Sequence, residues 1–188
     1  MPELTIRMAH YLIRELGLTG DDKVLDFGCA KGYLVRALRT LDIDAHGVDV
    51  SEYAINKADV GMAKYLTAIG SISDVAVYDG YSTVIAKDVL EHVPECEVLT
   101  LMRGWRQAGS KLFVAVPVAI EGTERFVVPQ YHNDVTHITI KSKSWWEEIS
   151  RKAGYEIVYS RYSFPGVKEN WVGKYPEGNV FLWLRARG

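Results

Sequence analysis

The segment of residues 24–32 (VLDFGCAKG) limits the choice of fold most, because an apolar run ends abruptly in a turn with two glycines. A short apolar run of this kind is typical of a buried strand. Gly28 and Gly32 allow the backbone to turn sharply and to approach a ligand without a Cβ in the way. In open α/β sheets, ligands bind beyond the carboxyl ends of the strands. We therefore expect this turn to face a ligand.

Strand and helix patterns alternate along most of the chain. Apolar runs predict strands over 23–27, 45–50, 65–69, 82–87, 111–116, 156–161 and 179–186. Helical spacing predicts helices over 3–18, 34–41, 52–58 and 98–105, and a capping box of Ser144 and Glu147 predicts another that ends near Gly154. The pattern predicts an α/β fold, a Rossmann-like three-layer sandwich with a mostly parallel seven-stranded sheet and an antiparallel edge hairpin.

Composition narrows the class of protein. The 188 residues are 48% hydrophobic, which fits a single domain over residues 1–188. A net charge of −2 gives no overall attraction to nucleic acid or to an anionic membrane. The two cysteines imply neither a disulfide framework nor a zinc motif. Without a signal-peptide pattern or an apolar run of about 20 residues, we expect a cytoplasmic protein with no membrane partner.

The glycine spacing and two carboxylates indicate which ligand the turn accepts. A dinucleotide site requires G-x-G-x-x-G, but Ala30 stands at the middle position here. Asp26 would repel a pyrophosphate and attract a ligand ammonium. Asp49 ends the next strand, where an acid can accept both hydroxyls of a ribose. The site therefore suits a nucleoside that carries an amino acid better than a dinucleotide.

Three motifs in this order carry a family resemblance. Residues 26–32 (DFGCAKG) resemble motif I of class I S-adenosylmethionine-dependent methyltransferases, and residues 47–51 (GVDVS) resemble the ribose motif that follows it. Residues 87–93 (KDVLEHV) are similar to the segment after the fourth strand in the small-molecule branch of that family. The resemblance covers about residues 24–117.

The resemblance implies S-adenosylmethionine as cofactor and S-adenosylhomocysteine as product. Ser71 stands where the family often has an acid that faces the adenine, so the Ser71 side chain or the Ile72 backbone is expected to serve instead. Cys29 is interpreted as a small residue that fills the turn. The residues expected beside the cofactor are Asp26, Gly28, Cys29, Gly32, Asp49, Val50, Ser71, Ile72 and Asp88.

The loop of residues 118–143 contains a second cluster of polar side chains, His132, Asp134 and His137. These residue types are plausible metal ligands. Alternatively, Asp134 orients one of the histidines as a general base, or the three side chains only brace the loop. We assign all three as catalytic candidates and assign no metal ligand.

The resulting hypothesis is a transfer of the S-adenosylmethionine methyl group to an oxygen or nitrogen of a small-molecule acceptor. The loops of residues 118–143 and 162–178 are expected to form the acceptor site. Two alternatives stay open at this point: a non-catalytic nucleoside-binding module of the same fold, and a nucleotide-dependent oxidoreductase. No nucleic-acid partner is indicated, and the sequence gives no oligomeric state.

Overall fold

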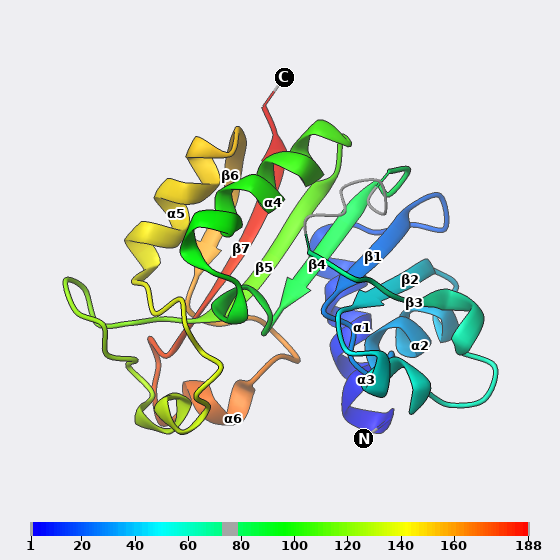
Figure 1. Ribbon diagram of the computed structural model, residues 1–188, viewed down its shortest axis with the longest axis horizontal. Coiled ribbons are helices and arrows are strands. Elements are labelled where there is room, and N and C mark those ends of the chain that lie inside the picture. The colour runs from blue at the N-terminus through cyan, green and yellow to red at the C-terminus, as the bar shows by residue number, and fades with distance from the viewer. Residues whose placement is uncertain (1, 73–78, 188) are drawn as a thin grey trace.

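A seven-stranded sheet forms the centre of the molecule, in the order β3-β2-β1-β4-β5-β7-β6 (Figure 1). The computed structural model describes residues 2–72 and 79–187. Neighbouring strands from β1 to β5 pair in parallel, whereas β7 pairs antiparallel with both β5 and β6. The strands are β1 (Lys23–Phe27), β2 (Asp44–Asp49), β3 (Leu66–Ala68), β4 (Thr83–Lys87), β5 (Lys111–Pro117), β6 (Tyr155–Arg161) and β7 (Asn179–Ala186). The predicted sheet is confirmed.

The helices lie between the strands and cover both faces of the sheet. They are α1 (Pro2–Leu16), α2 (Tyr33–Thr40), α3 (Glu52–Asn56), α4 (Glu95–Gln107), α5 (Lys143–Lys152) and α6 (Glu169–Val172). Short 3-10 turns are η1 (Ala63–Tyr65), η3 (Leu90–His92) and η4 (Pro129–Asn133). The short α6 lies within residues 162–178, which the sequence pattern predicts to be loop throughout.

Alternation along β5 divides the hydrophobic core into two. Leu112, Val114 and Val116 belong to the core beneath α4 and α5. Phe113 and Ala115 belong to the core beneath α1 and α2 on the opposite face. Successive side chains of a strand point to opposite faces, so a strand buried on both sides is apolar throughout. Figure 1 shows α4 and α5 in front of the sheet, and the two cores make the fold a three-layer sandwich.

The start of α5 differs from the prediction. The helix begins at Lys143, and its N-cap is Ser142, whose Oγ accepts a hydrogen bond from the Trp145 amide. Ser144 instead donates from its Oγ to Glu121 at 2.8 Å. The expected capping box is therefore wrong, because a second serine two residues earlier has the extended backbone that a cap requires.

The sheet topology brings several turns to one edge. The chain moves outward from β1 in both directions, to β2 and β3 on one side and to β4 and β5 on the other. The carboxyl ends of these parallel strands meet at the same edge, next to the switch point between β1 and β4. Because β7 is antiparallel to both its neighbours, β6 runs in the direction of β5, and residues 162–178 emerge at this same edge. Within the described part of the chain, no helix is long and apolar enough to cross a membrane.

Candidate active site

The turn after β1 is held in a conformation that depends on glycine. Gly28, Ala30 and Gly32 all have positive φ, at 78°, 47° and 73°. The Gly28 amide donates to the Val48 carbonyl at 2.9 Å, which attaches the turn to β2. A Cβ on Gly28 would lie 2.5 Å from Cγ2 of Val89, the residue that follows β4 closely. The glycine of this motif therefore allows both the backbone conformation and the close packing of two turns.

Asp49 joins this turn to the end of β2. Its Oδ2 accepts a hydrogen bond from the Ala30 amide at 2.8 Å, and its Oδ1 accepts one from the Ser51 amide at 2.8 Å. Ser51 in turn caps α3. The carboxylate is thus held at the carboxyl edge of the sheet, where the sequence predicts a ribose ligand. The adjacent Val50 is exposed over 57% of its surface.

Asp26 is a buried carboxyl group beside the turn. It lies in β1 between Gly47 of β2 and Ile85 of β4 and is only 5% exposed. Burial raises the pKa of Asp26 to about 7, with the Lys87 ammonium opposing this shift and the Asp49 carboxylate adding to it. A cavity of about 160 Å³ opens in front of this carboxyl, lined by Thr5, Met8, Asp26, Gly28, Cys29, Tyr33, Leu34 and Lys87.

Cys29 fills space within the turn. The side chain is buried, and a Cβ on Gly47 would lie 2.6 Å from the Cys29 Cβ. Burial raises the pKa of the Cys29 thiol, and the Asp26 and Asp49 carboxylates raise it further. A neutral, buried thiol is a poor nucleophile, which agrees with the interpretation of Cys29 as a small filler.

A smaller apolar cavity also has Gly28 in its wall. It has a volume of about 60 Å³, and Ile72 is part of its wall, while Ser71 beside it is exposed. Asp74, the acidic residue that follows closely, lies outside the described residues. The cavity is lined by Phe27, Gly28, Val48, Asp49, Val50, Ile69, Ile72 and Val89. The two cavities adjoin at Gly28, and most of the candidate cofactor residues line one or both of them.

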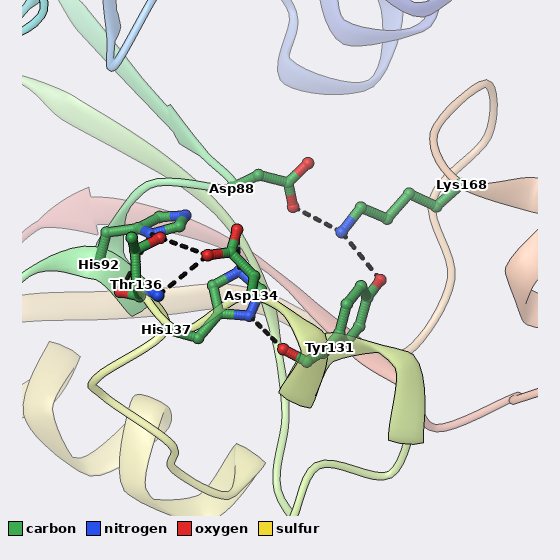
Figure 2. Close-up of polar contacts among 7 residues, drawn as sticks. All are labelled: Asp88, His92, Tyr131, Asp134, Thr136, His137 and Lys168. Carbon is green, nitrogen blue, oxygen red and sulfur yellow. Dashed lines mark hydrogen bonds and ion pairs between the residues drawn. The ribbon is translucent and has the colours of Figure 1, made fainter.

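Asp88 follows β4 and forms ion pairs with two lysines from different parts of the chain, Lys87 and Lys168, and Figure 2 shows the pair with Lys168. Lys87 Nζ lies 2.5 Å from Oδ2, and Lys168 Nζ lies 2.5 Å from Oδ1. Lys168 also donates to the Tyr131 hydroxyl at 3.1 Å and to Asn179 Oδ1 at 2.9 Å. Burial raises the pKa of Asp88, but the two ammonium groups outweigh it and hold the pKa below its usual value.

Lys87 and Lys168 line a larger cavity at this edge, about 460 Å³ in volume. Thr5, Met8 and Lys87 line both this cavity and the smaller one in front of Asp26, so the two adjoin. Its other lining residues include Arg7, Val167, Lys168, Glu169 and Trp171, most of them from residues 162–178. The sequence does not predict a role for Lys168 at the site, because a single lysine in a loop is usually exposed to solvent.

The three catalytic candidates of the loop have different surroundings. His132 is exposed, and its Nε2 accepts a hydrogen bond from the Phe126 amide at 3.0 Å, which favours the bracing role for this residue. Asp134 accepts hydrogen bonds from the Thr136 amide and hydroxyl at 3.0 and 2.5 Å. His137 is half-buried and lies 3.7 Å from Asp134 through its Nε2. The structure thus brings Asp134 near His137, whereas His132 is occupied elsewhere.

Glu91 and His92 lie beneath this loop. Glu91 is 1% exposed, and its carbonyl accepts the amides of Ile138 and Thr139. Burial raises the pKa of Glu91 to about 8, and the Asp88 carboxylate adds to this shift. Burial lowers the pKa of His92, and the nearby His137 lowers it further. Both positions lie within residues 87–93, which are similar to the family segment after the fourth strand.

Comparisons with known proteins agree with this geometry. A family model described as a methyltransferase domain matches residues 4–160. The chain belongs to this methyltransferase family, as the three sequence motifs predict. The expected enzyme class, a methyltransferase, is thereby confirmed. A search of curated proteins found no significant match.

Solved structures share the fold at low sequence identity. An S-adenosylmethionine-dependent methyltransferase from Archaeoglobus fulgidus is 16% identical, with a TM-score of 0.73 over 98% of this chain and 94% of that chain. A putative methyltransferase from Haloferax volcanii, in complex with the activator Trm112, is 18% identical, with a TM-score of 0.74 over 97% and 89%. The magnesium protoporphyrin IX methyltransferase of Synechocystis with bound S-adenosylhomocysteine is 17% identical, with a TM-score of 0.70 over 99% and 83%. The chain thus has the class I S-adenosylmethionine-dependent methyltransferase fold.

Proposed function

We propose that this enzyme transfers the methyl group of S-adenosylmethionine to an oxygen or nitrogen of a small-molecule acceptor. One observation carries the proposal: the carboxyl groups of Asp26 and Asp49 come from adjacent strands and both lie beside the glycine turn at the switch point of the sheet. Asp26 faces a cavity of a size for an amino-acid moiety, and Asp49 lies at the end of the adjacent strand. This arrangement supports binding of a nucleoside that carries a cationic amino acid.

Each cofactor residue then has a specific role. The Asp26 carboxylate accepts hydrogen bonds from the cofactor ammonium, and Asp49 accepts those of the ribose hydroxyls. Gly28, Cys29 and Gly32 allow the turn to approach the cofactor closely. The apolar cavity with Val50 and Ile72 in its wall receives the adenine, with Ser71 at its exposed rim. When bound, the cofactor supplies a sulfonium methyl group that is already activated, so proximity and alignment are the main contribution of the protein.

The acceptor binds in the cavity between α1 and residues 162–178. Three observations support this assignment: the cavity adjoins the one in front of Asp26, it is about 460 Å³ in volume, and it lies at the carboxyl edge of the sheet. Lys168 lines this cavity, and its ammonium contacts both Asp88 and the hydroxyl of Tyr131, which belongs to residues 118–143. Of the structures compared above, one is named for magnesium protoporphyrin IX, which is consistent with a small-molecule acceptor.

A nearby base completes the proposal for a hydroxyl acceptor. His137 and Asp134 lie next to each other in the loop of residues 118–143, so His137 is the better placed of the two loop histidines to take the acceptor proton. The acceptor oxygen forms its bond to the methyl carbon as the bond from that carbon to sulfur breaks, and S-adenosylhomocysteine leaves. His132 braces the loop through its hydrogen bond with the Phe126 amide and does not take the proton itself.

Calorimetric titration with S-adenosylhomocysteine tests the cofactor half of the proposal. Tight binding is expected in the unmutated protein, and Asp49→Asn is expected to weaken it by at least about tenfold, since a charge-assisted hydrogen bond contributes about 1.5–3 kcal/mol. Asp59→Asn changes an exposed carboxylate that only pairs with Arg36 and is the matched control. Absence of binding in the unmutated protein would refute the proposal.

A screen for S-adenosylhomocysteine release tests the acceptor half. The panel contains phenols, alcohols, carboxylic acids and amines of a size that fits the cavity. Release that depends on one acceptor class identifies the nucleophile. Binding of the cofactor product without release on any class points instead to a non-catalytic module of the same fold.

A further inference from the structure

Glu91, His92 and His137 form a compact group that the methyl-transfer reaction above does not fully use. One ligand atom from each lies within 4.8 Å of the others, and this is the one such group of three among residues 2–72 and 79–187. Glu91 and His92 come from η3 after β4, and His137 comes from the loop after β5. The two segments are joined by hydrogen bonds from the amides of Ile138 and Thr139 to the Glu91 carbonyl.

The free nitrogen of His137 is fixed by its hydrogen bond to the backbone. Nδ1 of His137 lies 2.7 Å from the carbonyl oxygen of Tyr131. A carbonyl only accepts, so Nδ1 carries the proton and Nε2 of the neutral ring keeps its lone pair. This is the tautomer in which histidine binds a metal ion, with its other ring nitrogen donating to a backbone carbonyl.

His92 is oriented in the same manner by a short chain of hydrogen bonds (Figure 2). Thr136 donates its hydroxyl proton to Asp134 at 2.5 Å. The Thr136 oxygen therefore accepts from Nδ1 of His92, which lies 2.8 Å away. Nε2 of His92 is thus also unprotonated in the neutral ring and available to a cation.

Glu91 supplies the third candidate ligand, and one of its carboxyl oxygens is a second, independent observation that points to a cation. The side chain is 1% exposed, and among the described residues its Oε2 has no hydrogen-bond partner. A buried polar atom without a partner costs about 1–3 kcal/mol, so such atoms are usually satisfied by an ion, a water or a ligand. Two neutral imidazoles next to this oxygen cannot donate to it through their free nitrogens.

From these observations we infer that Glu91, His92 and His137 bind a divalent transition-metal ion. Two imidazoles and one carboxylate suit Zn²⁺, Mn²⁺ or Fe²⁺ and leave positions open for water or a substrate oxygen. Ligand atoms about 2.0–2.2 Å from zinc lie at most about 4.4 Å apart, so small side-chain rotations bring all three onto one ion. Asp134 and Thr136 act as the outer groups that orient His92.

The position of the ion defines its role, which rests on the proposed function. The site lies beside Asp88 at the carboxyl end of β4, and Asp88 pairs with Lys168, which lines the cavity assigned to the acceptor. A bound cation lowers the pKa of a hydroxyl that enters its open position. With the ion bound, Nε2 of His137 is a ligand, and this role replaces the base role considered above. The acceptor would then lose its proton to solvent, its oxygen would bond to the cofactor methyl carbon, and the bond from that carbon to sulfur would break.

Metal binding is measured directly, without the methyl-transfer reaction. Tag-free full-length protein is dialysed against EDTA and titrated by calorimetry with ZnCl₂ or MnCl₂ alone, and Co²⁺ is added to record its visible absorption. We expect one equivalent to bind, with a Co²⁺ spectrum typical of nitrogen and oxygen ligands. Glu91→Gln, His92→Ala and His137→Ala are each expected to weaken binding by about tenfold or more.

Two further variants keep the test decisive. His10→Ala removes an exposed histidine of α1 and is expected to bind the metal as the unmutated protein does. Thr136→Val retains the three ligands and removes the hydroxyl that accepts from Nδ1 of His92, while the Thr136 carbonyl stays 3.2 Å from that nitrogen. Metal binding about tenfold weaker is therefore expected, and this variant leaves every ligand side chain in place.

The outcomes separate the metal site from the proposed function. Absence of metal binding in the unmutated protein, or equal binding in all variants, overturns the site. Titration with S-adenosylhomocysteine is repeated on each variant and is expected to be unchanged. If the cofactor product does not bind while the metal still binds at this group, the proposed function fails and the metal site stands.

Discussion

The Lys168 ammonium lies 2.5 Å from Oδ1 of Asp88 and connects the segment before β7 to the end of β4. The same ammonium donates to Tyr131 and Asn179, so one half-buried lysine holds three segments that are distant in the sequence. Burial lowers the pKa of Lys168, but Asp88 outweighs this effect and raises the pKa above its usual value. The two loops expected at the acceptor site are therefore fixed to the sheet by one shared cation.

Replacing Lys168 by methionine is expected to destabilise the fold. Removing one partner of a buried ion pair costs about 3–5 kcal/mol, and we expect about 1–2 kcal/mol here because Asp88 keeps Lys87 and is partly exposed. The free energy of unfolding in urea measures the effect. Lys174→Met, which changes an exposed lysine of the same segment, is the control and should have little effect. A double mutant with Asp88→Asn that is simply additive would mean that the pair contributes no coupling.

The affinity for S-adenosylhomocysteine is expected to depend on the protonation of Asp26. Burial raises the pKa of this carboxyl to about 7 in the free protein. Below that pH a proton must leave before the carboxylate can accept the cofactor ammonium, so affinity should rise by about tenfold per pH unit up to about pH 7 and then level off. Calorimetric titrations between about pH 5 and pH 8.5 measure this slope. A flat profile would contradict the assigned role of Asp26, and Asp26→Asn should give weak, pH-independent binding.

The same carboxyl should lower the stability of the unliganded protein at neutral pH. The folded-state pKa of Asp26, about 7, is above the unfolded value of 3.8, so its contribution to stability is complete below about pH 4 and is lost as the pH rises to about 7. At about pH 8, Asp26→Asn should raise the free energy of unfolding by at most about 4 kcal/mol. At about pH 4 the variant and the unmutated protein should be nearly equal. Urea unfolding at both pH values tests this, and a variant less stable than the unmutated protein at pH 8 would refute it.

Alanine at Gly28 should be much more harmful than alanine at Gly17. Both glycines have positive φ, at 78° and 64°. A Cβ at Gly17 meets nothing within 4 Å, so only the backbone strain of about 1–2 kcal/mol is expected there. A Cβ at Gly28 would also meet Val89 at 2.5 Å, which adds about 1–3 kcal/mol. Equal losses of unfolding free energy in the two variants would show that the contact with Val89 is easily relieved.

Much of the fold follows from local patterns in the sequence. β1 occurs at the predicted residues because a continuous apolar run next to glycines has few alternatives in a parallel sheet. The capping box of Ser144 and Glu147 predicts a start of α5 that is two residues late, since Ser142 and Ser144 offer similar caps and only the backbone at Ser142 decides between them. The short α6 was missed because glycine and proline dominate its surroundings.

The candidate site was predictable only where motifs have fixed spacing. Asp26 is the next-to-last residue of β1 and Asp49 is the last residue of β2, so their proximity follows from the order of these adjacent strands. The ion pair of Asp88 with Lys168 could not be foreseen, because no periodicity relates a loop lysine to a distant carboxylate. The sequence pattern groups His132 and His137 with Asp134, because these residues are close together in the chain. It does not predict that His137 lies near His92 and Glu91, which come from a different segment.

The direction of β6 has a consequence for how this protein can diversify. Because β6 runs with β5, residues 162–178 reach the same edge as the turn after β1, although they are encoded near the other end of the chain. The segments proposed for cofactor binding and for acceptor choice are therefore separable inserts on one scaffold. Exchange of residues 162–178 for those of another family member is a route to new acceptor preference that leaves the nucleoside half unchanged.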